Sequence, residues 1–293
     1  MIKLKYSIAL LLLFFAFTLR AQQSQSFRAY RTYHAAGDLL ERGMYVAASA
    51  QYRLVMESKL KTSNQPQFES ELSLLKENAQ YYVALCALEL GNDDAEDLFL
   101  KFMHDHPENP LAKLAVYQIG RSYSKKGNYK QALLWFDKIS ADQLNGRENT
   151  EYKFRKAYAY FTLDDYANAQ ILFGEVKNRN SPFTDDATYY FAYIAYLNKD
   201  YHLALLNFEK LKNSKKYISS YPYYITAVYF LDKRYDDVLA YAIPILNTTK
   251  QQNETEMLRI IGASYFAKKD YDNAVKYYDR FEARDQVRPK TPG

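Results

Sequence analysis

The sequence predicts an all-α solenoid of stacked antiparallel helix pairs, and three observations support this prediction. A short phrase that begins with tyrosine recurs along the chain at intervals of 34–37 residues. Within each phrase the apolar residues follow the spacing of a helix, not that of a strand. A second segment with its own pattern of small and large residues precedes each phrase. One supersecondary unit per period of this length is typical of repeat proteins.

The recurring phrase predicts the second helix of each pair. In the clearest copy, Tyr129 is followed by Ala132 and Phe136. These residues stand at i, i+3 and i+7, so they lie on one stripe of a helix. The anchor tyrosines of the five clear copies are Tyr129, Tyr166, Tyr201, Tyr235 and Tyr271. The spacing therefore places a helix directly after each anchor.

The segment before each anchor predicts the first helix of the pair. A small residue, such as Gly120, stands nine positions before the anchor, and in most copies a tyrosine such as Tyr123 follows three residues later. The small residue allows two helices to approach closely, and the ring fills the space beside their contact. Each unit is therefore expected to be an antiparallel helix pair.

Two further copies extend the repeat towards the N-terminus. One is anchored at Tyr45, and a degenerate one has Asp93 in place of the tyrosine and Glu96 in place of the alanine. A polar, turn-rich stretch at 58–68 is expected to form a longer loop between these copies. Farther along the chain, Pro244 is expected to end or kink the second helix of the sixth pair.

These helix pairs resemble tetratricopeptide repeats, whose first helix carries Gly or Ala and then Tyr, and whose second carries Tyr, Ala and Phe or Tyr. The resemblance covers most of the chain and implies a right-handed superhelix of about seven helix pairs. The expected organisation is a signal peptide at 1–21, a first pair at 22–57, the loop at 58–68, about six pairs at 69–288 and a tail at 289–293. We interpret the tail either as the approach to further repeats or as an end that a partner covers.

The N-terminus has the pattern of a secretory signal peptide. Lys3 and Lys5 precede an apolar run at 8–17, and Ala21 is a suitable cleavage position. An uncleaved membrane anchor is the alternative. Removal of residues 1–21 takes three basic residues from a chain of net charge +5, which leaves about +2. Because proteins that bind nucleic acids are usually far more basic, we expect no nucleic-acid partner. We expect an exported, periplasmic protein.

No pattern of catalytic or cofactor-binding residues is found in the sequence. His104 and His106 flank Asp105, but a metal site needs three or four converging ligands, so a solvated turn is the better interpretation. The only cysteine, Cys86, fits a small residue of the core. A phosphate-binding glycine loop and a nucleophile motif are also absent from the sequence. We therefore expect neither enzymatic activity nor a cofactor.

The most plausible binding surface lies on the first helices, which line the concave side in proteins of the resembled family. The positions twelve, eight and five residues before each anchor form a stripe that is rich in aromatic residues. The predicted partner-binding residues are Tyr117, Arg121, Phe154, Tyr158, Phe161, Tyr189, Tyr193, Tyr196, Tyr223 and Phe230. Tyrosine suits such a groove because its large flat ring ends in a polar hydroxyl.

Two interpretations of this stripe remain open at the level of the sequence. The rings either line a groove for a peptide, helix or glycan, or pack between neighbouring repeats. The first interpretation predicts a non-catalytic scaffold or adaptor that holds proteins together in a bacterial envelope. The alternatives are a protein that binds glycan or peptidoglycan, and the targeting module of a longer multidomain protein. A larger complex is also compatible with these patterns.

Overall fold

The computed structural model describes residues 27–59, 66–248 and 250–285. Within these ranges every regular element is a helix, which confirms the predicted all-α repeat array. The chain divides into two compact units, Met1–Leu144 and Asn145–Gly293, and each is considered by itself. None of the described helices combines the length and the apolar character that crossing a bilayer requires.

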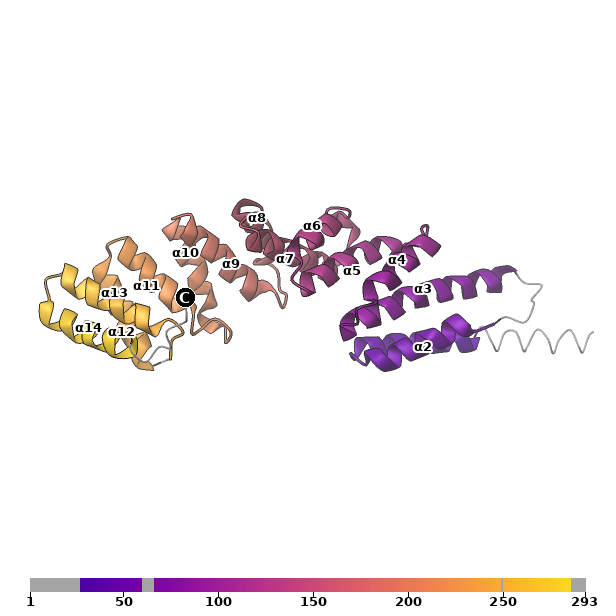
Figure 1. Cartoon of the computed structure of the whole chain (residues 1–293), viewed down its shortest axis with the longest axis horizontal. Coiled ribbons are helices and arrows are strands. Elements are labelled where there is room, and N and C mark those ends of the chain that lie inside the picture. The colour runs from indigo at the N-terminus through magenta and orange to yellow at the C-terminus, as the bar shows by residue number, and fades with distance from the viewer. Residues whose placement is uncertain (1–26, 60–65, 249, 286–293) are drawn as a thin grey trace, which may run out of the picture. The chain divides into compact units, whose positions relative to one another are not determined.

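The first unit consists of helices that pair with their neighbours in sequence (Figure 1). Its elements are a helix at 27–41, α2 (Tyr45–Glu57), α3 (Pro66–Leu90), α4 (Ala95–Asp105), α5 (Leu111–Lys125), α6 (Tyr129–Phe136) and the 3₁₀ turn η1 (Ala141–Gln143). α3 begins inside the stretch at 58–68 that was expected to be a loop. Proline is well suited to a first helical turn, because its missing N–H would have no partner there.

The second unit repeats the arrangement over four further pairs. Its elements are α7 (Gly146–Thr162), α8 (Tyr166–Val176), α9 (Thr184–Leu197), α10 (Tyr201–Phe208), the 3₁₀ turn η2 (Glu209–Asn213), α11 (Tyr221–Leu231), α12 (Tyr235–Thr248), α13 (Glu254–Ala267) and α14 (Tyr271–Asp285). We call the first helix of each pair the A helix and the second the B helix.

The anchor tyrosines mark the starts of the B helices. Each of them is the first residue of its helix, from Tyr45 in α2 to Tyr271 in α14. The residue before the anchor often caps the helix, as Asp200 does by accepting a hydrogen bond from the backbone N–H of Leu203 at 3.1 Å. The alanine and the aromatic residue of the phrase are buried, and Ala132 and Phe136 have no exposed surface.

The small residues of the A helices stand where two helices come close together. A Cβ atom added to Gly120 would lie 2.7 Å from the ring of Phe136, which is too close for an ordinary contact. Thr226 takes this position in α11, where its buried hydroxyl donates to the carbonyl of Pro222 at 2.8 Å. The interlocking of small and large residues that the sequence predicts therefore holds each pair together.

Every turn between an A helix and its B helix has the same backbone conformation. The residue two positions before the anchor has a positive φ, between 58° and 76°, in all seven turns that the structure describes. In the first unit these residues are Gly43, Gly91 and Gly127, whereas in the second they are Asp164, Lys199, Lys233 and Lys269. The next backbone N–H bonds to a carbonyl five residues earlier, as Asn128 does to Tyr123 at 2.9 Å. This left-handed cap ends the A helix and reverses the chain.

The degenerate second repeat departs from the sequence prediction inside α4. Its turn has the expected register, since Gly91 has φ 76° and the N–H of Asn92 bonds to Ala87. The helix, however, buries Ala95 and not Glu96, so the assignment of Glu96 to the alanine position is wrong. The cause lies in the tight turn after Asn92, whose carbonyl accepts from the N–H of Ala95 at 3.4 Å. The buried face of α4 therefore begins at Ala95, one residue earlier than the spacing of the repeat predicts.

Pro244 lies inside α12 and does not end it. The helix continues to Thr248, so early termination at the proline is wrong. Proline has no N–H to donate to the carbonyl of Ala240, and helices tolerate this loss at a cost of about 3 kcal/mol. The carbonyl of Pro244 itself accepts from the hydroxyl of Thr248 at 2.9 Å.

Candidate partner-binding surface

The predicted stripe lies on four successive A helices. Tyr117 and Arg121 belong to α5, Phe154, Tyr158 and Phe161 to α7, Tyr189, Tyr193 and Tyr196 to α9, and Tyr223 and Phe230 to α11. The structure assigns different surroundings to the residues of the two units. In the first unit they belong to the core or to an ion-pair cluster, and in the second they form a ladder of rings.

Tyr117 belongs to the core. Only 1% of its surface is exposed, and its ring lies 6.4 Å from that of Phe136 in α6. A partner cannot reach it without opening the helix pair. Its placement on a binding surface is therefore corrected, because its ring packs against the B helix of its own pair.

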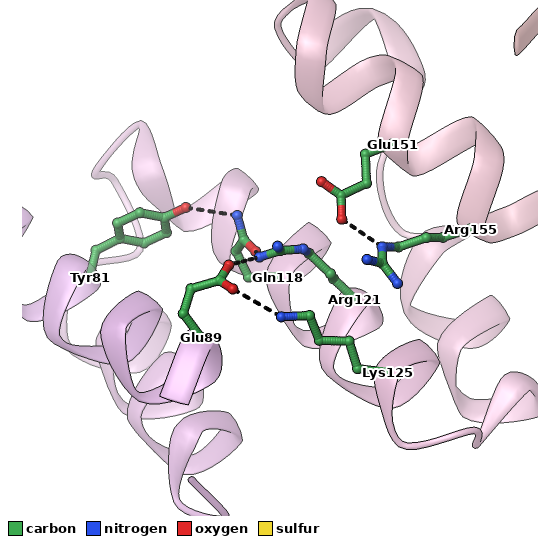
Figure 2. A network of polar contacts seen from close by, with 7 residues as sticks. All are labelled: Tyr81, Glu89, Gln118, Arg121, Lys125, Glu151 and Arg155. Carbon is green, nitrogen blue, oxygen red and sulfur yellow. Dashed lines mark hydrogen bonds and ion pairs between the residues drawn. The ribbon is translucent and has the colours of Figure 1, made fainter. Parts of the chain in front are cut away.

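Arg121 is part of a polar cluster between α3 and α5, which Figure 2 shows. Its guanidinium pairs with the carboxylate of Glu89, to which Lys125 also donates at 3.0 Å. Gln118 accepts from the same guanidinium at 3.2 Å and donates to the hydroxyl of Tyr81 at 3.4 Å. The cluster joins two successive A helices by charge-assisted hydrogen bonds.

The electrostatics of this cluster centre on Glu89. Its burial by itself would raise the pKa of the carboxyl group, but the charge of Arg121 and the hydrogen bonds from Lys125 and Arg121 outweigh burial and lower the pKa. Glu89 is therefore ionised at neutral pH. Only 14% of the Arg121 side chain and 18% of the Glu89 side chain are exposed. The side chain of Arg121 is thus largely buried and is held by its bonds to Glu89 and Gln118.

In the second unit, the rings of α7 pack on rings of the next A helix, α9, and of the residue just before it. Phe154 is stacked on Phe183 with ring centroids 4.8 Å apart, and Phe161 lies 4.9 Å from Tyr190. Tyr158 contacts Tyr190 edge to face at 5.3 Å. All three predicted residues of α7 are half-buried. They contribute to the packing between repeats and still keep part of their surface accessible.

The rings of α9 continue the ladder into α11. Tyr189, Tyr193 and Tyr196 all contact the ring of Tyr224, at 6.0, 5.5 and 5.6 Å. The hydroxyl of Tyr189 also donates to that of Tyr224 at 3.3 Å. Tyr223 continues the ladder, 5.0 Å from Tyr224. These three residues of α9 are half-buried, as are Tyr223 and Phe230 of α11.

We call the eight predicted residues of the second unit the aromatic ladder. Its members are Phe154, Tyr158, Phe161, Tyr189, Tyr193, Tyr196, Tyr223 and Phe230. Burial raises the pKa of Tyr189 and that of Tyr196 above the usual value of tyrosine, so both hydroxyls are neutral at pH 7. The ladder therefore offers flat rings and neutral hydroxyl groups. Such a surface suits the face of an apolar or aromatic side chain, or a sugar ring.

Sequence reasoning missed the residues that hold the ladder and the cluster together. Tyr190 and Tyr224 each stand eleven positions before an anchor, next to the stripe that was selected. Glu89 was also missed as the counter-charge of Arg121. The signal for the two tyrosines was present, because a tyrosine recurs eleven positions before the anchor in two successive repeats.

The other candidates from the sequence are held in ordinary structural environments. His104 is exposed, but His106 is not a residue of a solvated turn, because its ring lies 3.2 Å from the side-chain oxygen of Gln80. Within the described residues, no group of His, Cys, Asp and Glu side chains is arranged to hold a metal ion. Cys86 is fully buried, and this burial raises the pKa of its thiol to about 11.

Comparison with known proteins agrees with this helical geometry. Two models of the tetratricopeptide repeat match the sequence, one at residues 115–139 and one at residues 257–285. At these two helix pairs, the chain resembles tetratricopeptide repeats in sequence as well as in fold. The matches fall on α5 with α6 and on α13 with α14. No curated protein sequence matches the chain.

Solved structures with a similar fold include two of MamA. The structure of MamA AMB-1 has a TM-score of 0.52 at 15% identity, over 61% of this chain and 95% of that one. The structure of MamA MSR-1 has a TM-score of 0.50 at 16% identity, over 60% and 98% of the two chains. A tetratricopeptide repeat protein from Parabacteroides merdae ATCC 43184 has a TM-score of 0.47 at 14% identity, over 87% and 92%. At these identities the similarity concerns the fold alone.

Proposed function

We propose that the protein is a non-catalytic scaffold that binds a protein partner on the aromatic ladder of its second unit. The observation that carries this proposal is the row of half-buried rings on α7, α9 and α11. Each ring is held by neighbours, so binding costs little side-chain entropy, and each still offers part of its surface. Rigid aromatic anchors of this kind are enriched among the residues that dominate binding energy.

The chemistry of the ladder favours an extended peptide or a helix with apolar side chains. Within the ladder no member is charged, and the tyrosine hydroxyls can accept from or donate to a backbone. Fold similarity to tetratricopeptide repeat proteins supports a scaffold over an enzyme, since stacked repeats create extended concave surfaces for binding. We further propose that the protein works in a bacterial envelope, a location supported by the signal-like pattern at 1–21.

The test is site-specific photocrosslinking of the full chain in its native cells. A photoreactive phenylalanine analogue at Tyr193 is expected to capture one or two discrete proteins. The same analogue at Ile171 is the matched control, because Ile171 is 63% exposed but lies on the B helix α8. Fractionation of the same cells should find the protein in the periplasm. Equal products at Tyr193 and Ile171 would contradict the ladder as the binding surface.

A quantitative arm uses the captured partner in purified form. Tyr193→Ala is expected to weaken its binding at least tenfold, or about 1.4 kcal/mol, whereas Ile171→Ala should leave it unchanged. A glycan-binding protein would instead capture no protein and would bind soluble peptidoglycan fragments in a manner that depends on Tyr193. That result would keep the ladder as the site and change the class of ligand.

A further inference from the structure

In the second unit, each repeat packs on the preceding one in a regular way. The ring five positions before an anchor is covered by the ring eleven positions before the following anchor. Phe161 is covered in this way by Tyr190, at 4.9 Å, and Tyr196 by Tyr224, at 5.6 Å. The covered rings are half-buried as a result.

A second pair of positions follows the same rule. The ring eighteen positions before an anchor stacks on the ring twelve positions before the preceding anchor. Phe183 stacks on Phe154 at 4.8 Å, and Tyr217 stacks on Tyr189 at 4.4 Å. An A helix with a ring eleven positions before its anchor, preceded by a ring eighteen positions before it, is therefore shaped to rest on the preceding pair.

In the last described pair, the residues at the covered positions are exposed. Phe266 stands five positions before Tyr271 and contacts its ring at 5.5 Å, as in the earlier pairs. However, Phe266 is 59% exposed and Tyr271 is 55% exposed. On α14, one turn beyond Tyr271, Val275 is 58% exposed. At the position twelve before the anchor, the guanidinium of Arg259 bonds to Glu256 at 2.9 Å and about half of the side chain is exposed. We call these four residues, Arg259, Phe266, Tyr271 and Val275, the tail face.

In the first described helix, the residues at the covering positions are exposed. Phe27 stands eighteen positions before Tyr45 and is 61% exposed. His34 stands eleven positions before the same anchor and is exposed, and the ring of Tyr30 lies tilted against it with ring centroids 4.2 Å apart. Tyr30 is 52% exposed. We call Phe27, Tyr30 and His34 the head face.

We propose that the tail face of one copy of this chain binds the head face of a second copy. His34 and Tyr30 then cover Phe266, as Tyr190 covers Phe161 within the chain. Phe27 rests on Arg259 in a cation–π contact, in the place where Phe183 rests on Phe154. The contact is heterologous, because two different surfaces meet, so each copy keeps one face free for another copy.

Charge supports a second copy as the occupant. An A helix runs antiparallel to the B helix before it, so the start of the helix at 27–41 meets the end of α14 in this arrangement. Arg28 and Arg31 are exposed at that start, and Asp279 and Glu282 are exposed near that end. The opposite charges favour this pairing over the reversed one. The proposal does not depend on the function proposed for the aromatic ladder.

The experiment measures the size of the purified full chain by analytical ultracentrifugation over a range of concentrations. The expected result is reversible association that weakens at least tenfold in Phe27→Glu and in Phe266→Glu. Val46→Glu is the matched control, because Val46 is 70% exposed on α2 at a position that is exposed in every repeat. It should associate as the unchanged chain does. Circular dichroism melting of each variant confirms that the fold is retained.

Mixing the variants distinguishes head-to-tail contact from the other arrangements. Phe27→Glu keeps its tail face, and Phe266→Glu keeps its head face. Neither should associate alone, but an equimolar mixture should form dimers and no larger species. A chain that stays monomeric at high concentration would overturn the proposal. It would also be overturned if both variants associate normally, or if their mixture forms no dimer.

Discussion

The two units join successive A helices at corresponding places with different chemistry. Between α3 and α5, the carboxylate of Glu89 is shared by Arg121 and Lys125. Between α9 and α11, three tyrosines surround the ring of Tyr224. The close contact of the A and B helices at a small residue and the positive φ of the turns are common to both units. The repeat therefore depends on contacts within each pair, while the contact between pairs accepts either ions or rings.

The turns of the two units also differ, in the type of residue that adopts the positive φ. The first unit has glycine at each positive φ, and the second has Asp or Lys. A residue with a Cβ atom costs about 1–2 kcal/mol more than glycine in the left-handed region. The second unit therefore carries in its four turns a cost that glycine avoids in the three turns of the first unit.

The largest effect is expected from removal of the ring of Tyr224. Tyr224→Ala should lower the opening free energy of α9 and α11 by about 3–4 kcal/mol, because five neighbouring rings lose a contact. Hydrogen exchange of the full chain should detect faster exchange there and little change in α3 and α5. Tyr271→Ala, at an exposed ring, is the control and should change protection by less than about 0.5 kcal/mol. Uniform loss of protection in both units would show that the rings do not act locally.

A smaller effect is expected from loss of the charge of Glu89. Glu89→Gln should destabilise α3 and α5 by about 1–2 kcal/mol at pH 7, because Arg121 and Lys125 lose their anionic partner. The pKa of Glu89 is lowered in the folded state, so its stabilisation is full above the unfolded value of about 4.3 and is lost as pH falls through the folded value. The variant should therefore lose less stability than the unchanged chain below pH 4.3. Hydrogen exchange in α3 and α5 at pH 6 and pH 3.5 measures the stability of the variant and of the unchanged chain. If both lose the same stability between these pH values, the lowered pKa is not that of Glu89.

The smallest effect is expected from exchanging the turn residues. Lys233→Gly should stabilise the protein by about 0.5–1 kcal/mol, because glycine adopts a positive φ without strain. Gly127→Ala should destabilise it by about 1 kcal/mol, although a Cβ atom there would meet nothing within 4 Å. Thermal melting of the two variants should shift in opposite directions. Shifts of the same sign would show that the turn conformation does not control stability.

Most of the fold follows from the sequence, because the period of the helix and the small residue at each close contact both leave a local pattern. Tyr129, Ala132 and Phe136 are enough to place α6 and its buried face. The second repeat shows where this reasoning fails. The compact turn at Asp93 and Asp94 shifts the apolar face of α4, and this depends on backbone geometry that spacing does not record.

The candidate surface was less predictable than the fold. The sequence identified the rings of α9, but it could not tell that Tyr117 is buried while Tyr193 is only half-buried. Both belong to the stripe selected from the sequence, but Tyr117 packs on Phe136 of its own pair, whereas Tyr193 packs on Tyr224 of the next pair. Contacts such as Arg121 with Glu89 join residues 32 positions apart, which no local pattern shows.

The shifted face of α4 has a consequence for consensus engineering of this array. A design that aligns repeats by their turns would replace Glu96 with alanine to match the other copies. Glu96 is instead the acceptor of a hydrogen bond from the hydroxyl of Tyr123 at 2.6 Å, and the core position beside it already holds Ala95. Alanine in place of Glu96 would remove this hydrogen bond between α4 and α5 and would fill no cavity. A consensus for this chain should match the buried positions of its repeats, not the positions that an alignment of their turns makes equivalent.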